Sequence, residues 1–379
     1  ARMGLPRQRP RSVPYDFTWR SDLEIFPFES WRRILLRCAR KAPVSELDYG
    51  PAEGSAALRE SICAYLRRSR GVLCDPAQVV IVNGSQQALD LIARVLIEKG
   101  DKVAIEEPAY QGTREVLRAA GAHLLPVPVD GDGLDPTRMP SGARLAFLTP
   151  AHQFPTGAIL PKARRLALLE WARRRRAVLV EDDYNGEFLY EGRRFESLQT
   201  LDREGRVVHI GTFSRTVFSS LRIGYLIAPK KLVPAITAAK WLSDQHTVTL
   251  EQETLAEFIS SGLYERYLRR VRRRNAARRD ALLQAISAHL GNRVQVTGAG
   301  AGAHIVVWPA KDIRLAIDGK EKDITEEQVI ADAAARGVRV YGISSYFLKK
   351  PTRVGILLGY SRMRERDINE GIRRLSEVL

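Results

Sequence analysis

HIGTFSRTVFSSLRIGYLIAP, residues 209–229, is the stretch of sequence that decides the fold. It begins with apolar residues typical of a buried strand and continues into a turn of small polar residues, with Arg222 following the turn. In α/β proteins, ligands bind beyond the carboxyl ends of the sheet strands. The stretch therefore predicts a ligand-binding turn at the edge of a sheet.

The chain before this stretch alternates between short apolar strands and helices. QVVIVNG (Gln78–Gly84) predicts a strand, and the segment after it predicts a helix closed by Gly100. Further strand-like runs are DKVAIEE, HLLPVPV, RLAFLTP and AVLVEDD, and the leucine- and arginine-rich segment PKARRLALLEWARRRR predicts a helix before the last of these. This alternation indicates an α/β protein with a mostly parallel sheet covered by helices on both faces.

The pattern changes near residue 232, where long charged helices begin and reach about residue 290. Three strand candidates follow, VQVTGAGAGAHIVVW, GVRVYGIS and RVGILLGY, and then a closing helix. We expect an N-terminal arm and helix in residues 1–45, a large ligand-binding domain in residues 46–235, and connecting helices with a smaller α+β domain in residues 236–379.

Composition narrows the protein class. Of the 379 residues, 45% are hydrophobic, but no run of about 18 uncharged apolar residues occurs, so we expect no membrane span. The basic, proline-broken start contains no apolar stretch resembling a signal peptide. Cys38, Cys63 and Cys74 fit neither a disulfide framework nor a zinc site, so we expect a reduced protein in the cytoplasm.

The net charge of +16 is concentrated in three basic runs, Leu66–Arg70, Arg173–Arg176 and Arg266–Asp280. One interpretation is a surface for nucleic acid or another polyanion. The other is solvated helix faces in an arginine-rich protein. No zinc-finger or RNA-recognition motif accompanies the charge, and the sequence leaves both interpretations open.

Three polar turns follow predicted strands, and each has a structural as well as a functional interpretation. NGSQQA (Asn83–Ala88) begins a helix whose free amides could hold a phosphate or could form an ordinary N-cap. EDDY (Glu181–Tyr184) gathers three carboxylates that repel one another unless a cation or protonated base compensates them. A metal ion is possible there in principle, but no histidine or cysteine lies nearby in sequence, so we predict none. In PAHQFPTG (Pro150–Gly157), His152 and Gln153 offer donors, although a lone histidine is more often structural.

Taken in order, the motifs GPAEGSAALR, NGSQQAL, EEPAY, TPAHQFPTG, VEDDYNGEF, GTFSRT and LRIGY resemble fold-type I pyridoxal-phosphate proteins of the class I/II aminotransferase superfamily. NGSQQALDL, EDDYNGEF and GTFSRTVFSSLRIGY are especially similar to the aminotransferase-like domain of MocR/GabR-type bacterial regulators. The resemblance runs from about Phe17 to the C-terminus. It implies a seven-stranded-type large sheet, pyridoxal 5'-phosphate as cofactor, and a homodimer with sites at the subunit interface.

The resemblance also implies individual roles for the matching residues. The cofactor phosphate would be bound by Gly84, Ser85, Gln86, Thr212, Ser214 and Arg222, and by Tyr49 from the partner subunit. Tyr110 would stack on the pyridine ring. Asp182 would keep the pyridine nitrogen protonated, Tyr184 and Gln153 would bind the ring oxygen, and Arg353 would clamp a substrate carboxylate.

Arg215 departs from this family pattern. The resemblance places it where the family has the lysine that binds the cofactor covalently and moves protons during catalysis. A guanidinium stays protonated and is not an amine nucleophile. Arg215 could still neutralise the phosphate or the ring oxygen, so we expect noncovalent binding of pyridoxal or pyridoxamine phosphate.

A second departure is that no winged-helix DNA-binding domain precedes this domain, as one does in MocR-type regulators. Three hypotheses follow: an aminotransferase-like enzyme with lysine-independent chemistry on an amine or amino acid, the effector-sensing domain of a MocR-like regulator, or a pseudoenzyme that keeps only the fold. The chain could be a freestanding domain or a piece of a longer protein. We expect the enzyme-like hypothesis, which the missing DNA-binding domain favours, whereas the MocR/GabR-like motifs favour the effector-sensing domain. Nucleic acid would be a partner only if such a domain belongs to the full protein.

Overall fold

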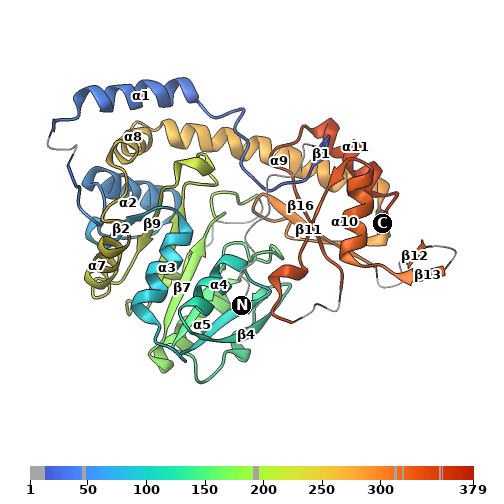
Figure 1. Cartoon of the computed structure of the whole chain (residues 1–379), viewed down its shortest axis with the longest axis horizontal. Coiled ribbons are helices and arrows are strands. Elements are labelled where there is room, and N and C mark those ends of the chain that lie inside the picture. Colours follow the sequence, from blue (N-terminus) through green and yellow to red (C-terminus); the bar gives the residue numbers. More distant parts are fainter. Residues whose placement is uncertain are drawn as a thin grey trace.

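A computed structural model of the chain describes residues 13–44, 48–190, 196–310, 314–317, 320–349, 351 and 353–379. A large α/β domain and a smaller C-terminal domain are joined by the long helix α9 (Leu263–His289), which runs along both of them in Figure 1. Residues 1–12 of the predicted arm lie outside the described residues.

The large domain is built on an eight-stranded sheet with the order β2-β9-β8-β7-β6-β3-β4-β5. Its strands are β2 (Val79–Val82), β3 (Lys102–Glu107), β4 (His123–Asp130), β5 (Gly133–Leu134), β6 (Leu145–Leu148), β7 (Val178–Asp183), β8 (Val207–Thr212) and β9 (Gly224–Ile227). Neighbours are parallel from β4 through β3, β6 and β7 to β8, whereas β9 is antiparallel to both β8 and β2, and β5 is antiparallel to β4. The predicted α/β fold with a mostly parallel sheet is confirmed, and the antiparallel pairings lie at the two ends of the strand order.

The strands are uniformly apolar because helices cover both faces of this sheet. Along β2, Val80 and Val82 pack on one face with α3 (Ser85–Leu96) and α7 (Val233–Asp244), while Val79 and Ile81 pack on the other. The other large-domain helices are α1 (Phe28–Lys41), α2 (Ala56–Arg70), α4 (Gln111–Ala119), α5 (Lys162–Arg175), α6 (Leu198–Leu201) and α8 (Thr249–Ser260). Helix α3 ends at Leu96 rather than at Gly100, because Ile97 is already extended and Asp101 caps the amide of Glu98.

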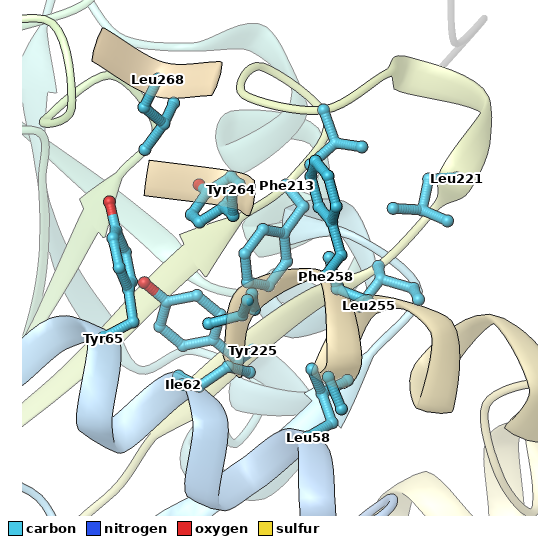
Figure 2. Packing of buried hydrophobic residues seen from close by; sticks show 14 of the residues in the cluster. Leu58, Ile62, Tyr65, Phe213, Leu221, Tyr225, Leu255, Phe258, Tyr264 and Leu268 are labelled. Carbon is cyan, nitrogen blue, oxygen red and sulfur yellow. The ribbon is translucent and has the colours of Figure 1, made fainter. Parts of the chain in front are cut away.

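Aromatic side chains anchor the turn that follows β8. Figure 2 shows Phe213, which directly precedes this turn, packed among Tyr225, Phe258 and Tyr264 from three different elements. The ring centroids of Phe213 and Tyr225 lie 5.7 Å apart, and the Tyr264 hydroxyl donates to Thr216 Oγ1 over 2.9 Å. The polar turn is therefore anchored to a buried apolar cluster through Phe213 and Thr216.

The smaller domain contains a four-stranded sheet with the order β10-β11-β16-β15. Its elements are β10 (Val294–Thr297), β11 (His304–Pro309), β15 (Tyr341–Gly342), β16 (Ile356–Gly359), α10 (Glu326–Ala335) and α11 (Glu365–Leu375), with a hairpin of β12 (Arg314–Ile317) and β13 (Lys320–Asp323) beside them. The predicted strand GVRVYGIS is divided between two sheets: β15 pairs with β16, while β14 (Val338–Arg339) pairs with the N-terminal strand β1 (Tyr15–Asp16). The N-terminal segment is thus part of the C-terminal domain.

The basic run on α9 faces both inward and outward. Arg278 is buried and donates to Asp22 over 2.8 Å, and Arg274 also pairs with Asp22. Arg266, Arg269, Arg270 and Arg273 are exposed at helical spacing. Part of the positive charge therefore fixes the N-terminal segment, and part forms an outward stripe.

Candidate functional site

Five turns meet at one edge of the large sheet. Because β9 is antiparallel to both β2 and β8, β2 runs in the same direction as β8, and so do β3, β6 and β7. The turns after these strands contain nearly all of the predicted site residues. This edge is the place where α/β proteins bind ligands.

The predicted phosphate residues form a cup between β2, β8 and β9. Gly84 has φ +81°, and a Cβ added there would lie 2.6 Å from Arg222 Nη2, so this position needs glycine for both its backbone and its space. The Arg222 guanidinium donates to the Asn83 carbonyl at 2.9 Å and to Ser214 Oγ at 3.4 Å. Thr212 Oγ1 accepts from the Ser214 amide at 3.2 Å. Ser85 begins α3, and no side chain caps this helix, so the amides of its first turn lack an intrahelical partner.

Strand β7 resolves the repulsion among its three carboxylates by pairing two of them. Glu181 lies 3.0 Å from His209 Nδ1 and accepts the amides of Leu198 and Gln199. Asp183 binds the Arg70 guanidinium at 2.5 Å. Asp182 has no hydrogen bond or ion pair within the described part of the chain, and its Oδ1 is buried. Of the three, Asp182 is the carboxylate left for a ligand.

The surroundings of Asp182 disfavour its charge. Burial, and then the nearby Asp183, raise its pKa from the ordinary value of 3.8 to about 7, although His209 and Arg215 partly offset this effect. A buried carboxylate without a partner is unfavourable for folding, so its presence points to a cationic or hydrogen-bonding ligand.

Aromatic and imidazole groups line the space beside Asp182. Tyr184 Oη lies 3.0 Å from His152 Nδ1, and burial lowers the pKa of His152 to about 4, so its imidazole is neutral at pH 7. Tyr110 is 40% exposed, and its ring meets the edge of Phe154 at a centroid distance of 5.9 Å. Gln86 reaches the same turn by donating to the Gly112 carbonyl at 3.4 Å.

Arg215 lies close enough to Asp182, Tyr110 and Tyr184 to interact with them electrostatically. Burial lowers the pKa of its guanidinium. Its one hydrogen bond among the described residues runs from Nη1 to the carbonyl of Trp19, at 2.9 Å. Ser21 Oγ donates in turn to the carbonyl of Arg215 at 2.6 Å. The N-terminal segment is therefore attached to the turn at both the side chain and the backbone of Arg215.

Three predicted site residues do not face Asp182: one is hydrogen-bonded within the protein, and two lie elsewhere. Gln153 is buried, and its amide binds Glu106, the carbonyls of Pro108 and Phe154, and Thr156, so it forms the wall beneath the site. Arg353 lies over the Trp308 ring, 5.4 Å from its centroid, in a separate cavity of about 650 Å³. Tyr49 is 75% exposed and packs against His246.

Some residues near the site had no signal in the sequence. Glu106 is buried beside Gln153 and Thr149, and burial raises its pKa to about 7. Trp19 and Ser21 reach Arg215 across almost two hundred residues of sequence. The pairing of β1 with β14 and the ion pairs of Asp22 with Arg274 and Arg278 hold this N-terminal segment in place. His304, from β11, stacks edge-on against His152 at 4.8 Å.

No group of three or more metal-ligating side chains occurs in the parts of the chain that the structure describes. Within those same parts, no helix is long and apolar enough to cross a membrane.

Comparison with known proteins agrees with the fold. The aminotransferase class I and II family model matches residues 20–362. The "Probable rhizopine catabolism regulatory protein MocR" of Rhizobium meliloti is 36% identical over 97% of this chain and 73% of that protein. The 2-aminoadipate transaminase of Thermus thermophilus is 31% identical over 94% of this chain and 87% of that enzyme.

Solved structures show the same architecture. The kynurenine aminotransferase of Pyrococcus horikoshii, solved with pyridoxamine phosphate (PMP), superposes with a TM-score of 0.87 at 27% identity, over 97% of this chain and 91% of that chain. The α-aminoadipate aminotransferase LysN of Thermus thermophilus, solved with N-(5'-phosphopyridoxyl)-L-leucine, gives 0.84 at 29% identity, over 97% and 92%. Taken with the family model, these likenesses show that the chain belongs to the aminotransferase class I and II family.

Proposed function

We propose that the chain binds pyridoxal phosphate, pyridoxamine phosphate or a cofactor–amino-acid adduct without a covalent bond, and that it senses the amine or amino acid that arrives with it. The observation that carries this proposal is the unpaired carboxylate of Asp182 beside a phosphate cup, with Arg215 standing where the family resemblance places the lysine.

The residues present fit the two ends of such a cofactor. The buried Oδ1 of Asp182 lacks a donor, which a protonated pyridine nitrogen would supply. At the other end, the cradle over Gly84 and the Arg222 guanidinium suit a phosphate, since Arg222 adds charge to the amides of a helix N-terminus. A bound cofactor of this kind supplies an electron-withdrawing ring. Tyr110 and Tyr184 would hold the ring between these ends.

The covalent anchor does not fit. The guanidinium of Arg215 cannot act as the amine. Lys162, Lys230 and Lys240 are engaged in ion pairs with Glu196, Asp75 and Asp244 respectively. We therefore assign Arg215 to charge neutralisation of the phosphate or ring oxygen, which holds the ligand but moves no proton.

Effector sensing follows from this division of roles. A site that binds without a proton-moving amine reports occupancy more readily than it turns over. Arg215 also contacts Trp19, so a ligand that recruits the guanidinium would alter the attachment of the N-terminal segment. Similarity to the MocR regulator supports this reading, and a DNA-binding partner domain would then lie in the full protein.

Lysine-independent chemistry is the second candidate, favoured by the Tyr184–His152 pair. The Tyr184 hydroxyl can donate a hydrogen bond to the neutral imidazole of His152 across 3.0 Å, and this bond holds a phenol and an imidazole in place at the site. Similarity to aminotransferases supports this candidate. Turnover of an amino acid by the purified protein, abolished in His152→Ala, would distinguish catalysis from sensing.

We also propose a homodimer. Tyr49 is 75% exposed. Four other large apolar side chains are also exposed: Val44 (84%), Trp241 (58%), Leu242 (76%) and Val248 (61%). Such a set of exposed apolar side chains is typical of a covered interface. In a dimer, Tyr49 would reach the phosphate cup of the partner subunit.

Equilibrium dialysis with pyridoxal phosphate, followed by borohydride reduction, tests the proposal. We expect binding that saturates, is lost in Asp182→Ala, and leaves no cofactor attached after reduction and denaturation. Arg215→Lys is the matched variant, and it should become permanently labelled. Permanent labelling of the unaltered chain would show that another lysine has taken over, and absence of binding would leave a pseudoenzyme.

A further inference from the structure

Two of the three cysteines come together in the folded chain. Cys63, on α2, and Cys74, in the segment between α2 and β2, are both partly exposed, and their Sγ atoms lie 3.2 Å apart. The spacing between them in the sequence matches no disulfide or metal motif, so their proximity is visible only in the folded chain. Gly71, with φ +69°, ends α2 and turns the chain back so that Cys74 returns to the helix.

We propose that Cys63 and Cys74 form a site of reversible oxidation, in which a hydroperoxide converts the two thiols into a disulfide. A disulfide has an S–S length of about 2.05 Å, so the sulfur atoms need to approach by only about 1.2 Å. Both side chains pack at the edge of the large apolar cluster, which keeps them facing each other. The third cysteine, Cys38, lies near Glu257, with its Sγ 3.8 Å from Oε2.

The hydrogen bond between the thiols gives them different roles. The Cys74 thiol donates to Cys63 Sγ, which lowers the pKa of Cys63 and raises that of Cys74. Cys63 is therefore the attacking thiolate and Cys74 the resolving thiol.

The reaction balances in two steps. Cys63 attacks a peroxide oxygen: an S–O bond forms, the O–O bond breaks, and hydroxide leaves. Cys74 then attacks the Cys63 sulfur: the S–S bond forms, the S–O bond breaks, and water leaves with the Cys74 proton. The two cysteines lose two electrons, and the peroxide gains two.

The bridge would close the end of α2 around a residue that supports the candidate site. Arg70 lies between the two cysteines and holds Asp183 at 2.5 Å, next to Asp182 on β7. Closing this segment restrains the unfolded chain, so we expect the oxidised protein to resist unfolding more than the reduced one. This inference stands whether or not the protein binds a cofactor.

Mild hydrogen peroxide treatment followed by non-reducing tryptic mass spectrometry tests the proposal. Trypsin cuts after Arg67, Arg68 and Arg70, so the Cys63 and Cys74 peptides stay together only if they are bridged. We expect a linked pair about 2 Da lighter than the sum of its parts, which dithiothreitol separates. Cys38→Ser is the control and should give the same product.

Both Cys63→Ser and Cys74→Ser should lose the linked pair, and circular dichroism would confirm that each variant is folded. The native protein should also form the bridge faster than the protein in guanidinium, where no fold brings the thiols together. Equal rates in the two conditions, separate sulfinic acids on each cysteine, or a bridge to Cys38 would overturn the proposal.

Discussion

Replacing Asp182 by asparagine should stabilise the ligand-free protein while removing its capacity to bind a pyridine ring. The carboxylate is buried and unpaired, and its pKa is raised from 3.8 to about 7. A change of this size corresponds to about 4 kcal/mol, since each pKa unit is worth about 1.4 kcal/mol. An asparagine amide without a partner costs about 1–2 kcal/mol in its place. The net gain should be about 2–3 kcal/mol.

The effect of the Asp182 carboxyl on folding stability depends on pH. A carboxyl group whose pKa is higher in the folded than in the unfolded state weakens the fold as pH rises from its unfolded to its folded value. Near pH 4 the folded-state carboxyl is protonated and costs little. Above about pH 7 both states are ionised, and the full cost applies. The stability difference between Asp182→Asn and the unaltered protein should therefore grow between about pH 4 and pH 7 and then level off.

Urea unfolding at a series of pH values, with pyridoxal phosphate absent, measures this difference. Asp183→Asn is the matched control, one residue along the same strand. Because Asp183 pairs with the partly buried Arg70, its loss should destabilise the protein by about 3 kcal/mol. The two neighbouring substitutions should thus have opposite effects.

An Asp182→Asn protein that is less stable than the unaltered one at about pH 8, or a difference independent of pH, would refute the reasoning. Either result would mean that Asp182 has a partner in the ligand-free protein. Added pyridoxal phosphate should raise the stability of the unaltered protein and leave that of the variant unchanged.

Three further outcomes follow from the geometry of the site. Gly84→Ala should destabilise the protein by about 1–2 kcal/mol in thermal unfolding and weaken phosphate binding, because φ is +81° and the added Cβ meets Arg222. Unchanged phosphate affinity would contradict a phosphate site at Gly84. Tyr49→Ala should lower pyridoxal phosphate affinity in dialysis, because the side chain, 75% exposed in the single chain, would reach the phosphate cup of the partner subunit. A monomer in gel filtration would remove the basis for this expectation. Arg70→Met should cost about 3 kcal/mol in urea unfolding by leaving Asp183 unpaired, and a neutral effect would argue against this ion pair.

The alternation of apolar strands with helices predicts the α/β fold because strands buried on both faces must be apolar throughout. The direction of β9 has no such signal. An antiparallel strand buried on both faces has the same composition as a parallel one, and only its pairing with β2 and β8 reveals its direction. The division of GVRVYGIS between two sheets is equally invisible in a local pattern.

The sequence by itself determined which residues could form the site, since strand ends in an α/β sheet meet at one edge and the motifs at those ends are local. The family resemblance assigned Asp182 of EDDY to the ligand, but the residues of the motif alone did not, because three adjacent carboxylates look alike until their partners are known. Only the tertiary structure shows that Glu181 pairs with His209 and that Asp183 pairs with Arg70. It also shows that Asp182 has no partner among the described residues.

The segment HIGTFSRTVFSSLRIGYLIAP shows the same difference between what the sequence predicts and what only the tertiary structure decides. Its composition alone indicates a strand, a polar turn and an arginine for an anion. That Arg215 reaches the carbonyl of Trp19, and that Cys63 meets Cys74, depends on contacts between segments whose local sequences carry no trace of one another. Local propensity fixes the elements of a chain, whereas the partner of a buried charge or thiol is decided by the packing that brings distant segments together.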